Sequence, residues 1–138
     1  MNVRDVMTSN PRTVSPNDSI QAAARIMKDM DTGAVPIVDG GRAVGIITDR
    51  DIAIRAVAQG SMDMRVQECG TSDLVCVSPD TSTSDAERLM GERQVRRLLV
   101  TENDRLLGIV SLGDIAVKEG RDRRTGDTLE NISQGVKH

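Results

Sequence analysis

Two short segments of the sequence place a hydroxyl side chain and a carboxylate three residues apart, directly after an apolar run. They are Thr48 and Asp51 in GIITDRD, and Ser111 and Asp114 in GIVSLGD. The apolar run is typical of a buried strand, and the residues that follow have the pattern of a helix. Each pair is therefore expected at a helix N-terminus, where unpaired backbone N–H groups attract anions and can hold a phosphate.

The same spacing also has an interpretation that needs no ligand. A Ser or Thr followed three residues later by an acidic residue forms a capping box, in which the two side chains satisfy the first N–H groups of the helix. One motif taken alone does not separate the capping role from phosphate binding. The recurrence of the motif in the second half of the chain, in matching surroundings, favours a ligand site.

The composition excludes several classes of function. The chain has 138 residues, a net charge of −3 and no Phe, Tyr or Trp. Its basic residues are dispersed and do not form the basic patch that is typical of nucleic-acid-binding proteins. The chain also has no aromatic side chain on which a base could stack. No stretch has the length of a membrane span and no signal peptide opens the chain, so we expect a cytoplasmic protein that does not bind membranes.

The titratable side chains offer no catalytic set. Cys69 and Cys76 lack metal-ligand spacing, and a zinc site needs about four ligands. The only histidine is the C-terminal His138, so no Ser–His or Cys–His pair is available for nucleophilic catalysis. We therefore expect two buried, reduced thiols, no metal site and no enzymatic activity.

The sequence is an internal duplication. Shifting the chain by 63 residues aligns residues 3–53 with residues 66–116 without a gap, and 16 positions are then identical. Chance would give about three identities from average residue usage. A single repeat of this size buries too little surface to be stable alone, so the two copies are expected to share a core.

Each repeat carries the pattern of a strand, a helix, two strands and a closing helix. The sequence thus predicts an α+β fold with the order β-α-β-β-α twice, in which the repeats pack through their sheets about a pseudo-twofold axis. The expected extended segments are 12–14 and 75–77, the expected strands include 43–48 and 106–111, and the expected closing helices are 49–57 and 114–118. The expected divisions are residues 1–63 for the first repeat with its linker, 64–120 for the second repeat and 121–138 for a C-terminal tail.

The duplicated pattern resembles the cystathionine-β-synthase (CBS) domain pair, also called the Bateman module. The resemblance covers residues 1–118 and rests on four segments and the second copy of the last one. These segments are VRDVMT at 3–8, TVSP at 13–16, GAVPIVD at 33–39 and GIITDRD at 45–51. A chain of this length resembles the small stand-alone bacterial members of the family, of the hypoxic-response type.

The resemblance implies a binding site for an adenine nucleotide in each repeat. It carries the ribose-binding carboxylate onto Asp51 and Asp114 and the phosphate-facing hydroxyl onto Thr48 and Ser111. The segments that line the adenine fall on Thr13 and Val14, on Ala34, Val35 and Pro36, on Cys76 and Val77, and on Arg97 and Leu98. A carboxylate suits the two ribose hydroxyls because it accepts more than one hydrogen bond.

The two copies differ in their basic residues. Arg50 lies inside the first strand-to-helix junction, where the second copy has Gly113, and Arg96 with Arg97 precedes the second hairpin only. An arginine can bind a phosphate through two hydrogen bonds. The alternative is that these arginines are solvated surface residues. The differences argue against equal occupancy of the two sites.

Two functions are compatible with this pattern. The first is a regulatory module that senses AMP, ADP, ATP or S-adenosylmethionine, with the nucleotide as a regulatory ligand and no required cofactor. Because no effector domain is recognisable, the regulated protein would be a partner in trans, and symmetric assembly favours a homodimer. The second function is a ligand-free interaction or oligomerisation module of the same fold, in which both motifs only cap helices.

Overall fold

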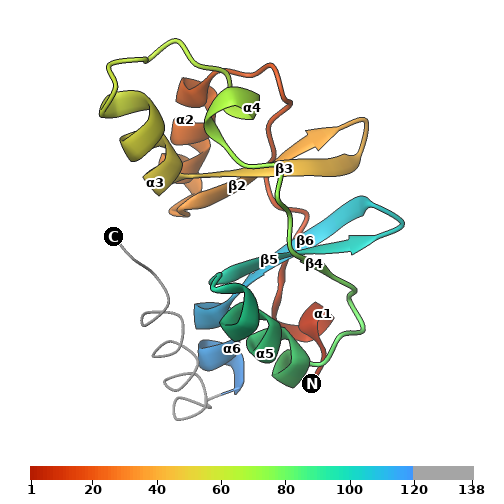
Figure 1. The fold of residues 1–138 in the computed structure, drawn as a ribbon. Helices are drawn as coiled ribbons and strands as arrows, with labels where there is room; N and C mark the ends of the chain where they lie inside the picture. The colour runs from red at the N-terminus through yellow and green to blue at the C-terminus, as the bar shows by residue number, and fades with distance from the viewer. Residues whose placement is uncertain (120–138) are drawn as a thin grey trace. The chain divides into compact units, whose positions relative to one another are not determined.

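The computed structural model describes residues 1–119, which divide into two compact units (Figure 1). Within the described range, unit 1 contains residues 1–10, 75–103 and 107–119, and unit 2 contains residues 11–74 and 104–106. The expected C-terminal tail, 121–138, lies outside the described residues. The expected domain boundaries at residues 63 and 120 are drawn from the sequence duplication and stay a prediction. The two compact units are defined differently, by which residues pack together.

Unit 2 holds most of the first repeat and the start of the second. Its elements are α2 (Ile20–Met30), β2 (Ala34–Asp39), β3 (Arg42–Thr48), α3 (Asp49–Asp51), η1 (Ile52–Val57) and α4 (Val66–Cys69). Helix α2 begins at a Ser cap, because Oγ of Ser19 accepts a hydrogen bond of 3.1 Å from the backbone N of Ala22. It ends at Asp31, whose φ of 51° takes the chain out of the helix.

Strands β2 and β3 form the predicted antiparallel hairpin. The turn contains Gly40 and Gly41, whose φ values of 60° and 85° favour glycine. In the hairpin register, Ala34 lies opposite Thr48. On its other side within unit 2, β2 receives a single parallel bridge at Val14, so the expected extended segment 12–14 is reduced to one bridge.

The helix that follows β3 is where the prediction is incomplete. Residues 49–57 are helical as expected, but after α3 the chain continues as the π-helix η1, in which the backbone N of Ala58 donates to O of Ala53 at 2.9 Å. A π turn takes one more residue per hydrogen bond than an α turn, and such turns are frequent at functional sites. Hydrophobic periodicity over six residues does not distinguish the two helix types.

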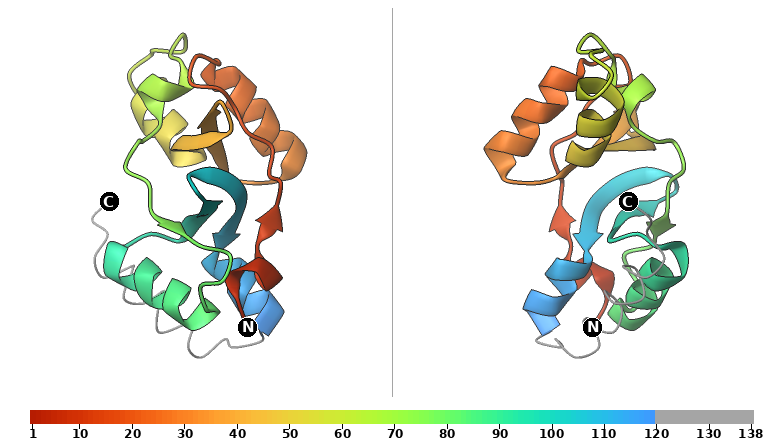
Figure 2. Two further views of the ribbon diagram at one scale, coloured as in Figure 1. Left: turned by 90° about the vertical axis from the view of Figure 1, so that its right-hand side faces the viewer. Right: turned by 60° about the vertical axis from the view of Figure 1, so that its left-hand side comes forward.

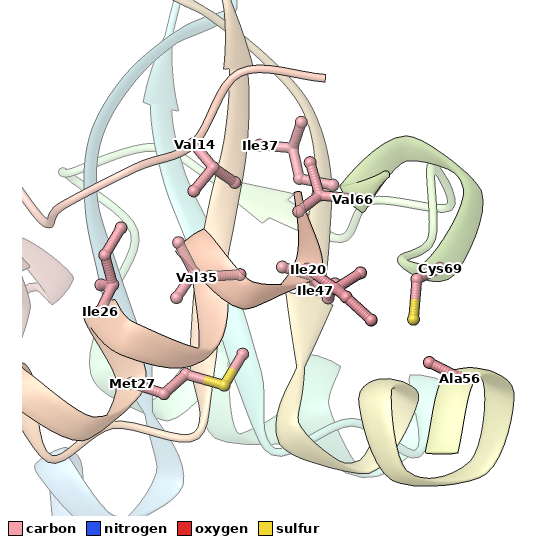
Figure 3. Packing of buried hydrophobic residues seen from close by; sticks show 11 residues of the cluster. Val14, Ile20, Ile26, Met27, Val35, Ile37, Ile47, Ala56, Val66 and Cys69 are labelled. Atoms are coloured by element: carbon pink, nitrogen blue, oxygen red, sulfur yellow. The ribbon is translucent and has the colours of Figure 1, made fainter. Parts of the chain in front are cut away.

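The core of unit 2 is aliphatic and joins all of its main elements (Figure 3). It contains Val14, Ile20, Ala23, Ile26, Met27, Val35, Ile37, Ile47, Ala56, Val66 and Cys69. Figure 3 shows Cys69 of α4 pointing toward the helix that carries Ala56. Helix α4 is therefore part of this core, although the repeat pattern assigns it to the second copy.

Unit 1 holds the second repeat and the first ten residues. Its elements are α1 (Val3–Val6), β1 (Thr8–Ser9), β4 (Cys76–Val77), α5 (Thr83–Arg93), β5 (Arg97–Glu102), most of β6 (Arg105–Ser111) and α6 (Leu112–Glu119). Strand β4 pairs in parallel with β5, and β1 pairs antiparallel with β6. The closing helix begins at Leu112 rather than at residue 114, because its capping residue is Ser111.

The core of unit 1 is also aliphatic. It contains Val3, Val6, Val77, Ala86, Met90, Leu98, Val100, Val110, Leu112 and Ile115. Figure 2 shows the short helix α1 beside α6, in agreement with the packing of these two helices. The mixture of helices and strands in the predicted repeated order confirms the α+β class.

The two short opening helices are exchanged between the repeats. In unit 1 the backbone N of Val3 donates to O of Thr81 at 2.8 Å, and in unit 2 the backbone N of Val66 donates to O of Asp18 at 2.9 Å. These donors are 63 residues apart, and so are the acceptors. The opening helix of each repeat thus completes the core that is built by the other repeat.

Candidate functional site

The junction between β3 and α3 is a reciprocal capping box. Oγ1 of Thr48 accepts a hydrogen bond of 3.1 Å from the backbone N of Asp51, and Oδ2 of Asp51 accepts one of 2.9 Å from the backbone N of Thr48. The Asp51 side chain is only 16% exposed. The predicted hydroxyl and carboxylate are therefore held together at a helix N-terminus, and the carboxylate keeps acceptor capacity beyond its cap bond.

The junction between β6 and α6 repeats this geometry. Oγ of Ser111 accepts a hydrogen bond of 3.0 Å from the backbone N of Asp114, and Oδ2 of Asp114 accepts one of 3.0 Å from the backbone N of Ser111. Both side chains are half-buried, as at the first junction. The capping prediction is thus confirmed at both junctions. Capping does not exclude a ligand, because each carboxylate has a second oxygen.

Both junctions are joined to the segment that precedes the hairpin. The backbone N of Asp49 donates to O of Gly33 at 2.9 Å, and the backbone N of Leu112 donates to O of Arg96 at 2.9 Å. These bonds bring the start of β2 and the start of β5 beside the capping boxes. The structure therefore places Ala34 next to Thr48, as the expected site requires.

The first extended segment of each repeat lies along the far side of β2 or β5. In unit 2 the backbone N of Val14 donates to O of Pro36 at 3.1 Å, and in unit 1 Cys76 and Val77 pair in parallel with residues 99 and 100. Val14 and Val77 are buried in the two cores, whereas Thr13 and Cys76 are exposed. The expectation that both thiols are buried is therefore wrong for Cys76, which lies on a two-residue strand.

The aliphatic side chains expected to line the adenine are themselves buried. Ala34, Val35 and Pro36 of β2 are buried, and so is Leu98 of β5. Buried aliphatic side chains of this kind leave backbone edges as the polar groups available to a base. The structure thus places the candidate residues at the junctions and along the strands, where polar atoms come from the backbones, the capping residues and the side chains of Thr13, Cys76 and Arg97.

The copy-specific arginines flank the junctions from the solvent side. Arg50 and Arg96 are exposed and Arg97 is half-buried. The backbone N of Arg50 donates to Oδ1 of Asp49 at 2.8 Å, which fixes the turn in which Arg50 lies. Arg50 thus belongs to the first junction, and Arg96 and Arg97 lie beside the second, where O of Arg96 accepts from the backbone N of Leu112.

A basic residue that the sequence analysis did not select lies beside the first carboxylate. Nη1 of Arg55 is 3.7 Å from Oδ1 of Asp51. The signal that could have identified it is the i,i+4 spacing of an acid and a base on a helix.

Nearby, Sγ of Cys69 donates to the backbone O of Asp51 at 3.4 Å.

The thiol of Cys69 responds to this surrounding. Burial raises its pKa, the Asp51 carboxylate raises it further, and the Arg55 guanidinium opposes the shift. Cys69 is thus a protonated thiol at neutral pH, inert compared with an exposed cysteine. Among residues 1–119 no group of three or more His, Cys, Asp or Glu side chains is arranged to hold a metal ion.

Comparison with known proteins identifies the family. The model of the CBS domain matches residues 3–57 and again residues 66–118. The chain belongs to the CBS domain family. The resemblance read from the repeated motifs is therefore confirmed, and the two matches coincide with the two halves of the internal duplication.

Relatives of similar length support this assignment. The chain is 45% identical to the CBS domain-containing protein YhcV of Bacillus subtilis over 132 residues, which covers 95% of this chain and 94% of that protein. It is 37% identical to hypoxic response protein 1 of Mycobacterium tuberculosis over 117 residues, covering 82% and 81% respectively. Proteins composed of a CBS pair and little else are thus close relatives.

A solved CBS pair adds information about ligands. It was determined in complex with 5′-methylthioadenosine and S-adenosyl-L-methionine, and it is 30% identical to this chain with a TM-score of 0.80, over 89% of this chain and 98% of that one. Both of its ligands carry an adenosine group.

Within the part of the chain that the structure describes, no helix has the length and apolar character needed to cross a membrane.

Proposed function

We propose that this protein is a regulatory module that binds an adenine nucleotide at its two capped strand-to-helix junctions. The observation that carries the proposal is the pair of matching capping boxes, Thr48 with Asp51 and Ser111 with Asp114, each with a half-buried carboxylate that retains a second oxygen. The adenosine-containing ligands of a CBS pair with 30% identity support the choice of ligand class.

The chemistry of binding follows from the groups at each junction. The carboxylate accepts hydrogen bonds from the ribose hydroxyls, because its second oxygen is not used by the cap. The N-terminal N–H groups of the helix and the Thr48 or Ser111 hydroxyl face the phosphate or the group that replaces it. The adenine contacts the aliphatic strand surface and the backbone edges of β2 or β5, since the chain has no aromatic residue.

The wider role of the module follows from what the chain contains. We infer that it is a sensor and not an enzyme, that it acts on a partner protein in trans in the cytoplasm, and that it assembles as a homodimer. The competing role is an interaction module in which both motifs only cap helices. The two roles differ in one measurable property, which is a stabilising affinity for a nucleotide.

Calorimetric titration of the full chain with AMP, ADP, ATP and S-adenosylmethionine tests the proposal. We expect saturable binding of at least one of them, and weaker binding of its 2′-deoxy form by about tenfold, because one hydrogen bond to a charged acceptor is lost. GMP is the control for the base. If none of the four ligands produces heat or raises the melting temperature, the sensor function is wrong and the capping-only module stands.

A further inference from the structure

Arg55 links the first candidate site to the segment that opens the second repeat. Its Nη1 atom donates to the backbone O of Cys69 at 3.0 Å and of Gly70 at 3.1 Å, and lies 3.7 Å from Oδ1 of Asp51. All of these groups belong to unit 2. One guanidinium therefore contacts both the carboxylate of the capping box and the C-terminal end of α4.

The end of α4 is held tightly against the strand that leads to the site. The backbone N of Thr71 donates to O of Ile46 at 2.9 Å, and the backbone N of Ile46 donates to O of Thr71 at 2.9 Å. A Cβ atom added at Gly70 would lie 2.6 Å from O of Ile46, so the two backbones are in direct contact. Movement of α4 is thus coupled to β3 and, through Arg55, to Asp51.

An ordinary surface ion pair does not explain this arrangement. Exposed i,i+4 pairs contribute little to stability because both side chains are solvated. The Arg55 side chain is half exposed, yet its Nη1 is used on two main-chain carbonyls that are 14 and 15 residues away in sequence. Such a contact orders a tertiary junction, and the planar fork of Arg suits several acceptors at once.

We propose that Arg55 is a positioning residue that orients Asp51 for the ribose and couples occupancy of the first site to α4. The inference rests on the proposed function, because it assigns a regulatory route to the same site. Ribose hydroxyls that bind Oδ1 of Asp51 use part of its acceptor capacity while Arg55, 3.7 Å away, holds the carboxylate in place. The strength of the Arg55 contact with Asp51, relative to its hydrogen bonds with the carbonyls of Cys69 and Gly70, therefore depends on the ligand. The residues after α4 lead along the chain to Val75, where unit 1 resumes.

The second repeat lacks this device and supplies a matched control. The position equivalent to Arg55 under the 63-residue shift is Lys118, a single ammonium group on a solvent-exposed part of α6. Within residues 1–119, Asp114 forms no ion pair at the distance that defines the Asp51–Arg55 pair. Ligand-dependent coupling of this kind is thus specific to the first site.

The experiment compares Arg55→Met, Arg55→Lys and Lys118→Met, each combined with Asp114→Ala so that only the first site is measured. Affinity is determined by calorimetry with whichever of AMP, ADP, ATP and S-adenosylmethionine binds the unmodified protein most tightly. Alkylation of Cys69 by iodoacetamide is followed by peptide mass spectrometry, with the exposed Cys76 as the internal reference. Cys69 reports on α4 because its thiol is buried beside Asp51.

We expect Arg55→Met to weaken binding at the first site about tenfold, because a carboxylate that is not held in place loses about one hydrogen bond to the ribose. It should also speed the alkylation of Cys69 several-fold, because release of α4 exposes the thiol by more than loss of the guanidinium raises the thiol pKa. The variant should abolish the effect of the nucleotide on that rate. Arg55→Lys retains the charge on a shorter side chain that lacks the reach of the guanidinium to the carbonyls of Cys69 and Gly70, so it should recover affinity and not the protection of Cys69. Lys118→Met should change neither quantity.

Two results would overturn the inference, and they are distinguishable. If Arg55→Met binds the nucleotide as tightly as the parent and the nucleotide still changes the alkylation of Cys69, Arg55 has only a structural role and the sensor function survives. If the unmodified protein binds none of the four ligands, the sensor function and the inference fail together.

Discussion

The two strand-to-helix junctions have the same cap in different surroundings. Their capping hydrogen bonds agree to within about 0.1 Å, since the first has lengths of 3.1 and 2.9 Å and the second has two of 3.0 Å. The first junction continues into a π-helix and carries an ion pair with Arg55, whereas the second continues into the regular helix α6. The cap was retained after the duplication while the groups around the second carboxylate oxygen diverged.

The difference between the two junctions indicates which residues can make the two candidate sites prefer different ligands. A capping box contributes only about 1 kcal/mol to helix stability, and its two members serve that role equally well at both junctions. Any difference in ligand preference between the sites must therefore come from the neighbours of the box. At the first site the basic residues in or beside the junction are Arg50 and Arg55, and at the second they are Arg96 and Arg97.

The largest expected effect separates the two carboxylates. Asp51→Ala and Asp114→Ala should each remove one nucleotide site and leave the other, with a loss of about 1.5–3 kcal/mol, which is about tenfold to a hundredfold in affinity. Calorimetry with a two-site analysis measures this loss. Asp39→Ala is the control, because Asp39 is an exposed acid at the end of β2 away from the junction. A fall in melting temperature with unchanged affinity for both sites would show that the carboxylates only cap helices.

The second prediction compares two glycines near the junctions. A Cβ atom at Gly45 would lie 2.8 Å from the backbone O of Thr71, whereas one at Gly113 would meet only Oγ of Ser111 at 3.7 Å. Gly45→Ala should therefore destabilise the protein by about 1–3 kcal/mol through overpacking. Gly113→Ala should stabilise it by up to about 1 kcal/mol, because alanine favours the helix.

Urea denaturation of both variants measures these changes in the free energy of unfolding. Equal stability of the two variants would mean that the contact between β3 and Thr71 relaxes at no cost. In that case the rigid connection between α4 and the first junction would not exist in solution.

The third prediction concerns the copy-specific arginines. Removal of Arg50 or of Arg96 with Arg97 should weaken binding of ATP more than that of adenosine, by roughly threefold each, because the lost attraction is that of an exposed charge to phosphate. The difference should shrink in high salt, since exposed charges are screened. Titrations at two salt concentrations provide the measurement. An equal loss for ATP and adenosine would place these arginines against the nucleoside rather than the phosphates.

The smallest expected effect is on the pH dependence of stability. The pKa of Cys69 is raised in the folded state above its ordinary value of 9.0, so the folded protein retains the thiol proton longer than the unfolded chain does. The contribution of the Cys69 thiol to the free energy of unfolding is fully present below pH 9, and it is lost as the pH rises through the folded-state pKa. Cys69→Ala should flatten this alkaline limb in melting curves from pH 8 to 10. An unchanged alkaline limb would assign the loss of stability to other groups.

Much of the fold could be predicted from the sequence because it depends on local signals repeated twice. The hairpin of β2 and β3 and the two capping boxes follow from short patterns that the 63-residue shift reinforces. The exchange of α1 and α4 could not be predicted, because helices of four residues have no usable periodicity. Their location is decided by tertiary burial of Val3 and Val66.

The candidate site was predictable to a similar degree. The side chains of the capping boxes were identified by residue type and spacing, and the structure shows them in mutual contact. The role of Arg55 was not predicted because its main partners are the backbone carbonyls of Cys69 and Gly70. Backbone acceptors produce no pattern of residue types that a sequence could show. The π-helix that carries Arg55 was missed for the same reason, since its identity depends on a backbone hydrogen bond.

The exchange of the opening helices also sets an order of events during synthesis. Residues 11–74, which form nearly all of unit 2, leave the ribosome before residues 75–119, which supply every strand of unit 1 except β1. Helix α1 is made before residues 11–74, whereas its hydrogen-bond acceptor at Thr81 and most of the core that buries Val3 are made after them. Domains generally fold as they emerge from the N-terminus. Here helix α1 stays without its packing partners until residues 75–119 have been made.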